Sequence, residues 1–291
     1  MANAKAAHSA NVPGDFFVDT TCIDCDTCRW VAPDTFHDIG DQSAVHAQPA
    51  TQAQHTAALR ALVACPTASI GVRDAESRAA LREVSESFPV PLADDVFYCG
   101  YHAESSFGAA SWFIRRPEGN VMIDSPRFAA PLVKRIEQIG GIKWLYLTHR
   151  DDVADHAKWA AKFGAARVIH ADDARGLDAE LKLRGHEPHE LEPGLVIHPV
   201  PGHTKGSTVL HYRDKFLVTG DHLAYSPTRG HLYAFASACW YSWDEQVKSM
   251  QRLLPLRFEW VLPGHGRMLN ASADEMARQM EQCVRWMTSR A

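Results

Sequence analysis

The chain has 291 residues, a formal net charge of −5 and 16 histidines. Its length suits one mid-sized domain joined to a small one, and its negative charge argues against a nucleic-acid-binding surface. No apolar run approaches the roughly 20 residues that a membrane helix needs. The start of the chain is Ala-rich and polar and lacks the apolar core of a signal peptide, so we expect a cytoplasmic protein.

Four segments are predicted along the chain from its composition and patterning. A helix from about Thr51 to Ala64 stops before Pro66, because proline cannot continue a helix. The stretch FPVPLADD is extended and punctuated by proline, as in a linker. We therefore expect a disordered tail, a small domain, a linker and a larger domain over residues 1–13, 14–73, 74–95 and 96–291.

The small domain carries a run of cysteines with regular spacing. Cys22, Cys25 and Cys28 are each separated by two residues, and Cys65 stands before a proline much later in the chain. Three thiolates on a tight loop can hold three corners of an iron–sulfur cubane, and a remote cysteine supplies the fourth. A structural zinc site more often shows two separated cysteine pairs. The remaining cysteines, Cys99, Cys239 and Cys283, are interpreted as small buried hydrophobic residues.

The segments FFVDTTCIDCDTCRWVAPDTF and ACPTASI resemble single-cluster bacterial ferredoxins. The resemblance spans about 60 residues and implies one 4Fe–4S cluster held by Cys22, Cys25, Cys28 and Cys65. It also implies a redox partner for this domain.

The larger domain alternates predicted strands with helices, and its strands lead into polar loops that contain His or Asp. Four such loops hold His149, His203, Asp221 and His265, and glycines flank the last three of these residues. Imidazoles combined with carboxylates suit zinc, iron or manganese rather than calcium. We therefore expect one or two zinc or iron ions, or manganese, at the strand ends.

The segments VPGHTKGS, FLVTGD, VLPGHG and NVMIDS resemble the metallo-β-lactamase superfamily, and specifically its glyoxalase-II-like branch. The resemblance covers about 195 residues. It implies an α/β fold, an αββα sandwich preceded by the small α+β ferredoxin-like domain. It also implies that Asp221 bridges two metals and that Asp124 is structural.

The first metal motif of that family, His-x-His-x-Asp-His, is altered in this chain. Asp151 stands where the second His belongs, and the Asp–His pair arrives two residues late as Asp155 and His156. One reading keeps this pair as ligands and lets Asp151 or Asp152 replace the missing His. In the other, only one metal position is complete and Asp152 is a helix N-cap. The predicted ligands are His149, Asp155, His156, His203, Asp221 and His265, with Asp155 orienting the nucleophile.

Three functions are compatible with these motifs. The first is a metallo-hydrolase in which metal-bound hydroxide attacks an ester, thioester or similar bond of a small molecule. The second is an iron-dependent oxidoreductase of the same fold that receives electrons from its ferredoxin domain. The third is an electron carrier or cluster sensor without catalysis, against which the three intact metal motifs argue.

Overall fold

The computed structural model describes residues 2–290, and these form two compact units. The first unit contains residues 1–120 and 125–142, and the second contains residues 121–124 and 143–291. The boundary therefore runs through the region predicted as one large domain, whereas the predicted tail, small domain and linker all fall within the first unit. The four predicted segments remain predictions as domains.

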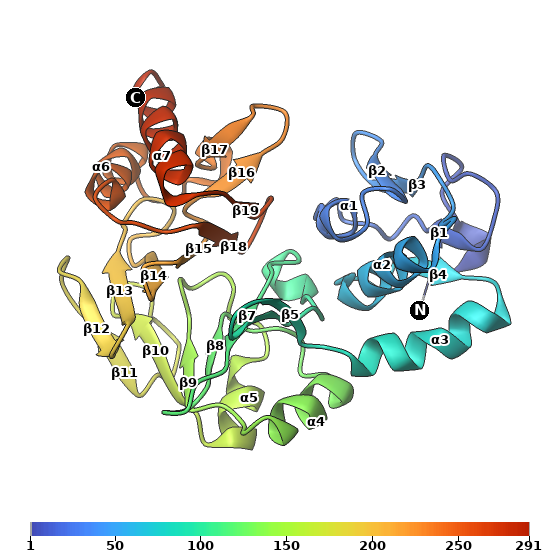
Figure 1. Ribbon diagram of the computed structural model, residues 1–291, viewed down its shortest axis with the longest axis horizontal. Coiled ribbons are helices and arrows are strands. Elements are labelled where there is room, and N and C mark those ends of the chain that lie inside the picture. Colours follow the sequence, from blue (N-terminus) through green and yellow to red (C-terminus); the bar gives the residue numbers. More distant parts are fainter. Residues whose placement is uncertain (1, 291) are drawn as a thin grey trace. The chain divides into compact units, whose positions relative to one another are not determined.

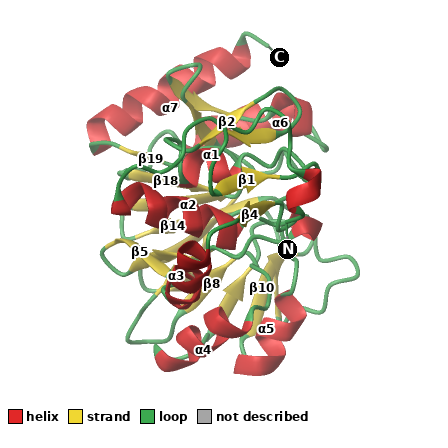
Figure 2. Ribbon diagram, turned by 90° about the vertical axis from the view of Figure 1, so that its right-hand side faces the viewer, coloured by secondary structure: helices red, strands yellow, loops and turns green. Residues whose placement is uncertain are grey.

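The N-terminal part of the first unit is a small α+β arrangement. Strands β1 and β4 form an antiparallel pair, β2 and β3 form a second pair, and α2 lies beside the first pair (Figure 2). Helix α2 begins with a capping box, in which Thr51 and Gln54 satisfy each other's backbone N–H groups. The elements are η1 Ala4–Ala6, β1 Phe16–Val18, α1 Thr27–Val31, β2 Phe36–Asp38, β3 Ser43–Val45, α2 Gln52–Ala64 and β4 Ile70–Val72.

The structure differs from the expectation of a disordered tail over residues 1–13, of which Met1 lies outside the described residues. Ala7 bridges to Asp19, and the His8 N–H donates to the Val18 carbonyl at 2.9 Å. The Asn11 side chain accepts from the N–H groups of Val18 and Val45, both at 3.0 Å. This segment is ordered because it satisfies backbone groups that strands β1 and β3 leave open.

The predicted linker also has regular structure. Helix α3 occupies its first half, and its proline-punctuated second half forms β5, which pairs antiparallel with β6. Phe88 lies in the chain between α3 and β5. It is fully buried, and its ring packs edge-on against those of Tyr98 and Tyr101. This part of the first unit consists of α3 Ala75–Glu86, β5 Val90–Ala93, β6 Val96–Tyr98, η2 Glu104–Ser106, β7 Trp112–Ile114 and α4 Ala130–Gln138.

The second unit contains a parallel set of strands and a mixed six-stranded sheet. The parallel set runs in the order β11-β10-β9-β8, and the mixed sheet in the order β12-β13-β14-β15-β18-β19. The elements are β8 Val121–Ile123, β9 Trp144–Tyr146, α5 His156–Phe163, β10 Ala166–His170, β11 Leu181–Leu183, β12 His189–Glu192, β13 Leu195–Pro199, β14 Thr208–Tyr212, β15 Phe216–Gly220, β16 Ala224–Ser226, β17 His231–Tyr233, η3 Ala236–Ala238, α6 Trp243–Leu253, β18 Trp260–Pro263, β19 Leu269–Asn270 and α7 Ala273–Thr288.

These strands and helices stack in layers, as the sequence predicts. The Tyr146 hydroxyl of β9 donates to Thr208 of β14 at 2.7 Å, which joins the two sets of strands through a buried bond. Helices α6 and α7 cover the outside of the six-stranded sheet, and α5 lies against β9 (Figure 1). The apolar layer under α6 and α7 includes Val247, Met250 and Met280. The predicted fold class, an αββα sandwich preceded by a small α+β domain, is confirmed.

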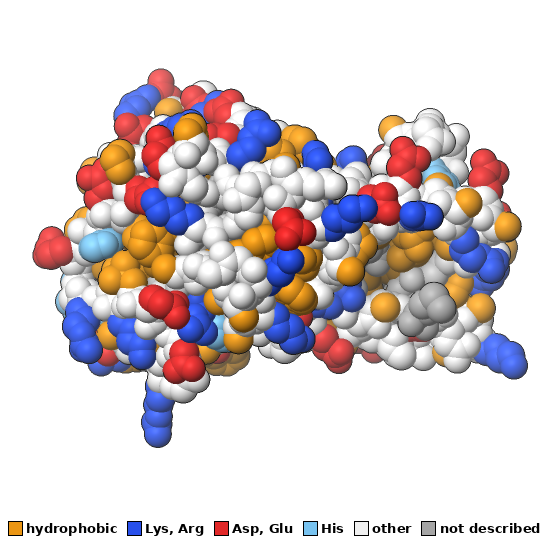
Figure 3. Space-filling model, turned by 90° about the horizontal axis from the view of Figure 1, so that it is seen from below, with side chains coloured by type: hydrophobic (Ala, Val, Ile, Leu, Met, Phe, Trp, Pro, Cys, Tyr) orange, Lys and Arg blue, Asp and Glu red, His pale blue; other side chains and the backbone are white. Residues whose placement is uncertain are grey.

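Within residues 2–290, no helix is both long and apolar enough to span a bilayer. On the face drawn in Figure 3, basic and acidic side chains are interspersed with apolar ones and form no broad region of one sign.

Phe88 is a sensitive point of the first unit, because its ring is fully enclosed. Phe88→Ala should lower the free energy of unfolding by about 3–5 kcal/mol, the usual cost of removing a buried aromatic ring. Chemical denaturation followed by circular dichroism measures this loss. Phe107→Ala is the matched control, because that ring is 55% exposed, and it should change stability by less than about 1 kcal/mol. Equal effects of the two substitutions would contradict the packing described.

Candidate functional site

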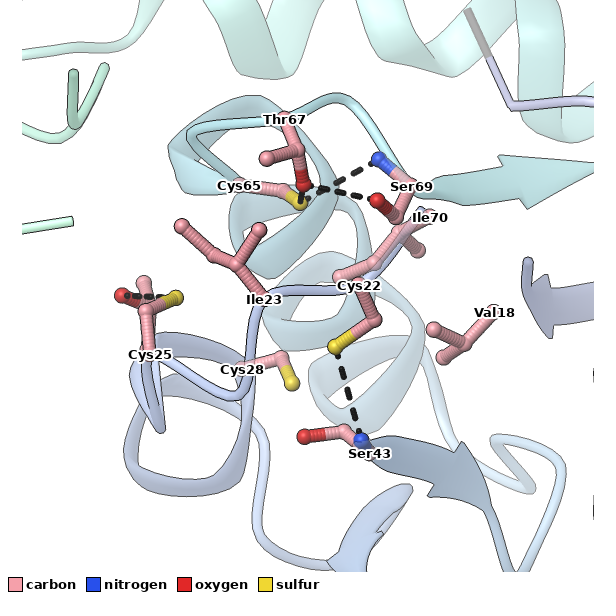
Figure 4. A pocket seen from close by; sticks show the side chains of 11 residues that line it. Val18, Cys22, Ile23, Cys25, Cys28, Ser43, Cys65, Thr67, Ser69 and Ile70 are labelled. Carbon is pink, nitrogen blue, oxygen red and sulfur yellow. Dashed lines mark hydrogen bonds between the residues drawn. The ribbon is translucent and has the colours of Figure 1, made fainter. Parts of the chain in front are cut away.

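The four predicted cluster ligands line one pocket of the first unit. Cys22, Cys25 and Cys28 enter it from the loop before α1 and from α1 itself, and Cys65 enters from the end of α2. Figure 4 shows their sulfur atoms directed toward the same space, beside Ile23. None of these cysteines forms a disulfide. The spacing therefore identified side chains that the fold brings together.

The surroundings of these sulfurs fit thiolate ligands of an iron–sulfur cluster. Backbone N–H groups of Ser43 and Ser69 point at the sulfurs of Cys22 and Cys65, at 3.4 and 3.3 Å. Burial, with a smaller contribution from the neighbouring Cys65 and Cys22, raises the pKa of Cys25 to about 11. Four thiolates so close together need a cationic centre to offset their charge, and cluster iron provides one.

The second unit brings together six side chains from four strand-end loops. His149 follows β9, His203 follows β13, Asp221 follows β15 and His265 follows β18. The Asp221 carboxylate lies at the middle of this group. Its Oδ2 atom is 3.8, 3.7 and 3.8 Å from the Nε2 atoms of His149, His203 and His265. One oxygen facing three imidazole nitrogens is the arrangement expected of a carboxylate between metal positions.

Asp151 and Asp152 complete this group. Asp151 Oδ2 is 3.5 Å from His203 Nε2 and 4.0 Å from His149 Nε2. The two oxygens of Asp152 face different imidazoles, with Oδ2 at 4.0 Å from His149 Nε2 and Oδ1 at 3.9 Å from His265 Nε2. Two sets have ligand-like spacing: His149 with Asp151 and His203, and His149 with Asp152 and Asp221.

The electrostatics of the group favour a bound cation. The buried atoms His149 Nε2, His203 Nε2, Asp152 Oδ2 and Asp221 Oδ1 have no hydrogen-bond partner among the described residues. Burial raises the pKa of Asp152 well above its usual range, and the charges of Asp221, Asp124 and Asp151 add to this shift. Burial also lowers the pKa of His149, which keeps its ring neutral and able to bind metal. The residues present therefore fit a metal centre.

Hydrogen bonds orient two of the imidazoles toward Asp221. The Nδ1 atom of His203 lies 2.5 Å from the Ala238 carbonyl, which only accepts, so Nδ1 carries the proton and Nε2 is free to ligate. The Nδ1 atom of His149 lies 3.0 Å from the Thr148 hydroxyl, which itself donates to Asp124. The structural role predicted for Asp124 agrees with this arrangement.

Two glycines, Gly220 and Gly264, lie where the loops approach the ligand side chains too closely for a larger residue. A Cβ atom on Gly264 would lie 2.8 Å from Asp152 Oδ2 and 2.9 Å from Asp221 Oδ1. Gly220 has a φ of +48°, and a Cβ there would lie 2.4 Å from the Thr148 hydroxyl oxygen. Any larger residue at these two positions would displace the ligands or the residue that orients them.

Asp155 and His156 lie away from this group. Asp155 is the N-cap residue of α5 and pairs with Lys158 at 2.7 Å, whereas Asp152 is not the cap. His156 begins the helix, and the charges that act on it are those of Arg167, Asp178 and Glu180. Neither belongs to a set with ligand spacing among the described residues. Helix α5 begins at His156, so this pair forms the start of the helix and is not part of the loop that carries His149.

Two exposed aromatic side chains lie next to His203. Trp240 and Tyr241 are 63% and 48% exposed, and their N–H groups donate to the His203 carbonyl at 2.9 and 3.1 Å. The Trp240 ring centre is 6.2 Å from that of His203. The hydrophobic character of Trp240 and Tyr241 alone predicts core packing, so the sequence gives no signal that they are exposed.

Comparison with known families agrees with this geometry. Residues 95–281 match the family described as the metallo-beta-lactamase superfamily, and residues 18–72 match the 4Fe-4S single cluster domain of ferredoxin I. The chain belongs to the metallo-β-lactamase superfamily. It carries an N-terminal single-cluster ferredoxin domain, and both predicted resemblances are confirmed.

Individual sequence relatives match this chain at low identity or over a short part of its length. An uncharacterized protein of Bacillus subtilis, YmaE, is 23% identical over 188 residues, which are 60% of this chain and 69% of that protein. A hydroxyacylglutathione hydrolase of Anaeromyxobacter dehalogenans is 35% identical over 88 residues, which are 28% of this chain and 34% of that enzyme.

Solved structures share the fold at low sequence identity. The DIM-1 metallo-β-lactamase structure aligns with a TM-score of 0.54 and 17% identity, covering 67% of this chain and 95% of that one. The FIM-1 enzyme of Pseudomonas aeruginosa aligns with a TM-score of 0.52 and 17% identity, covering 67% and 93%.

The contact between His203 and Asp151 predicts a titration in the metal-free protein. Burial alone lowers the pKa of His203, but the nearby Asp151 carboxylate and the charge of Asp221 raise it above its usual value. Asp151→Asn should therefore lower this pKa, as measured by NMR from the imidazole C2 proton. Because the folded pKa exceeds the unfolded one, about 6.5, the interaction stabilises the fold below that pH and is lost as pH rises through the folded pKa.

The control for this titration is Asp155→Asn, which removes a carboxylate that pairs with Lys158. It should leave the His203 titration unchanged. A His203 pKa that responded to Asp155 and not to Asp151 would contradict the geometry.

Proposed function

We propose that this protein is a metal-dependent hydrolase with a two-metal centre and a redox-active 4Fe–4S cluster in its ferredoxin domain. The observation that carries the proposal is the position of Asp221 Oδ2, within 3.8 Å of three imidazole Nε2 atoms. Two further carboxylates complete two ligand positions around it. The metallo-β-lactamase fold and the partial match to a hydroxyacylglutathione hydrolase are consistent with hydrolysis.

The proposed ligands divide into two positions that share Asp221. His149, Asp151 and His203 would hold the first metal, and Asp152 and His265 would hold the second. Asp151 takes the place of the missing motif His, and Asp152 takes the place predicted for Asp155. Asp152 is 2% exposed and has oxygens directed at both sides of the centre, whereas Asp155 pairs with Lys158.

The chemistry follows from these positions. A divalent metal held there would lower the pKa of a coordinated water to about 7 and polarise an ester or thioester carbonyl. Asp152 orients the attacking water and accepts its proton. His149 and His203 keep Nε2 unprotonated because their Nδ1 atoms are engaged by Thr148 and by the Ala238 carbonyl. No serine or cysteine nucleophile is needed.

The exposed aromatic pair points to the kind of substrate. A tryptophan that is 63% exposed beside a metal ligand offers a flat apolar surface that water covers poorly. We propose that Trp240 and Tyr241 contact an apolar group of a small acyl substrate, such as the acyl chain of a thioester or ester.

A second candidate function is oxidoreduction at iron, with electrons supplied by the cluster. The observation that favours it is the ligand set, because three carboxylates with three imidazoles form a harder site than the histidine-rich one of the family motif. Harder sites favour iron or manganese over zinc. Metal analysis separates the candidates: zinc with turnover of acyl substrates supports hydrolysis, and two non-cluster irons without hydrolysis support redox chemistry.

The proposed ligand set predicts which substitutions remove metal. Asp152→Ala should release about one metal per chain and lower thioester hydrolysis by at least about 100-fold, since even outer partners of metal ligands are worth about 10–100-fold. Mass-spectrometric metal analysis and turnover of a panel of acyl thioesters and esters measure this. Asp155→Ala and His156→Ala are the matched controls and should retain both metals. Loss of metal from the controls but not from Asp152→Ala would restore the ligand set predicted from sequence.

The proposed cluster fixes the iron and sulfide content expected of the ferredoxin domain. Anaerobically purified protein should contain about four irons and four acid-labile sulfides in the ferredoxin domain, with visible absorbance that bleaches on reduction. Cys65→Ser should abolish these signals, because Cys65 faces the cluster pocket. Cys283→Ser should preserve them, because Cys283 lies on α7 and is buried in the core of the second unit. A colourless wild-type protein with a single zinc bound to the four cysteines would contradict the proposal.

A further inference from the structure

The cluster pocket is bordered by residues that lie outside the ferredoxin match. That match ends at residue 72, yet a segment around His102 contacts the loop of Cys25 and the end of α2. This segment belongs to the metallo-β-lactamase match, which begins at residue 95, and lies in the first unit with the four cysteines. His102 is 1% exposed and occupies the centre of the contact.

A chain of hydrogen bonds runs from Tyr98 to the Cys25 sulfur. The Nδ1 atom of His102 is 2.6 Å from the Gly108 carbonyl, which only accepts, so Nδ1 carries a proton. The Tyr98 hydroxyl is 2.6 Å from Nε2, and burial raises the pKa of Tyr98 well above its usual range, so this phenol stays protonated and donates to Nε2. The Nδ1–H is also 3.0 Å from the Thr27 hydroxyl, which is 3.3 Å from Cys25 Sγ.

The direction of the last bond depends on the state of Cys25. As a thiolate bound to iron, the sulfur has no proton and only accepts, so the Thr27 hydroxyl must donate to it. The other acceptor within reach of this hydroxyl is the Gly108 carbonyl at 3.4 Å, which is long for an O–H···O bond, whereas the 3.3 Å to Cys25 Sγ suits the larger sulfur atom. The His102 Nδ1–H is shared between the Gly108 carbonyl and the Thr27 oxygen, and its donation to that oxygen leaves the Thr27 hydroxyl proton directed at the sulfur.

Gly108 and Arg127 secure this contact. A Cβ atom on Gly108 would lie 2.8 Å from Cys25 Cβ and 3.0 Å from its sulfur, so only glycine allows the approach. The Arg127 guanidinium donates to the carbonyls of His102 at 2.7 Å and of the ligand Cys65 at 3.1 Å. Arg127 thus brings a positive charge to the backbone of the ligand Cys65 and links it to the His102 segment.

We propose that His102 and Arg127 are positioning residues that set the reduction potential of the cluster. The inference rests on the proposed 4Fe–4S cluster. A donor to a cluster thiolate and a nearby positive charge both stabilise the reduced cluster, which carries one more negative charge, and so raise the potential. The ferredoxin domain is accordingly tuned by residues of the metallo-β-lactamase part of the chain.

The test is an anaerobic redox titration of the full-length, cluster-loaded protein, followed by electron paramagnetic resonance. Thr27→Val, which removes only the hydroxyl, should lower the reduced-to-oxidised ratio at fixed solution potential about tenfold, equivalent to about 59 mV for one electron. His102→Gln should have a similar effect because it places its amide near the position of Nε2. His102→Asn places an amide donor near the position of Nδ1 and should keep the potential close to that of the wild-type protein. Thr27→Ser keeps the hydroxyl and should also leave the potential close to the wild-type value. Arg127→Gln should also lower the potential.

A double variant decides whether His102 acts through Thr27. In the Thr27→Val background, His102→Gln should cause no further shift, because no hydroxyl remains to be positioned. Unchanged potentials at full iron and sulfide content, or shifts that add in the double variant, would overturn the inference while leaving the cluster itself intact. If His102→Gln loses its cluster, Thr27→Val and Thr27→Ser still decide the hydroxyl's role. A wild-type chain that takes up no cluster refutes both the proposed cluster and this inference.

Discussion

The arrangement of the loops in the second unit depends on the need to neutralise the charge of the Asp221 carboxylate. One of its oxygens faces three imidazole nitrogens, and Asp152 brings a second carboxylate into the same buried space. Buried charges of like sign are costly unless a cation or a proton neutralises them. The strand ends, the glycines that let the loops approach and the bonds that fix the imidazoles all place these groups together. The fold is thus arranged to hold positive charge at this point.

The ferredoxin domain follows a similar principle with sulfur ligands. Four cysteines share one pocket, and backbone N–H groups are directed at two of them. The donor chain through His102 and the charge of Arg127 come from sequence beyond the ferredoxin match. Residues of the two family matches therefore contact each other within the first unit, through hydrogen bonds of His102 and Arg127.

Local patterns in the sequence predicted the fold and most of the site. The spacing of Cys22, Cys25 and Cys28, and the glycine-flanked His203, Asp221 and His265, signal their chemistry because each motif is short and its geometry is local. The altered first motif was harder, because the register of α5 decides which acidic residue points inward, and that register depends on packing. The order of residues 2–13 and the role of His102 depend on contacts between segments far apart in the chain, for which one sequence carries no signal.

The most direct test of the metal centre is anomalous diffraction from crystals of anaerobically purified protein, recorded at the iron, zinc and manganese absorption edges. The account predicts two peaks about 3.5–4 Å apart on either side of Asp221. One should lie near His149, Asp151 and His203, and the other near Asp152 and His265. Peaks beside Asp155 and His156, or a single peak that does not touch Asp221, would contradict it.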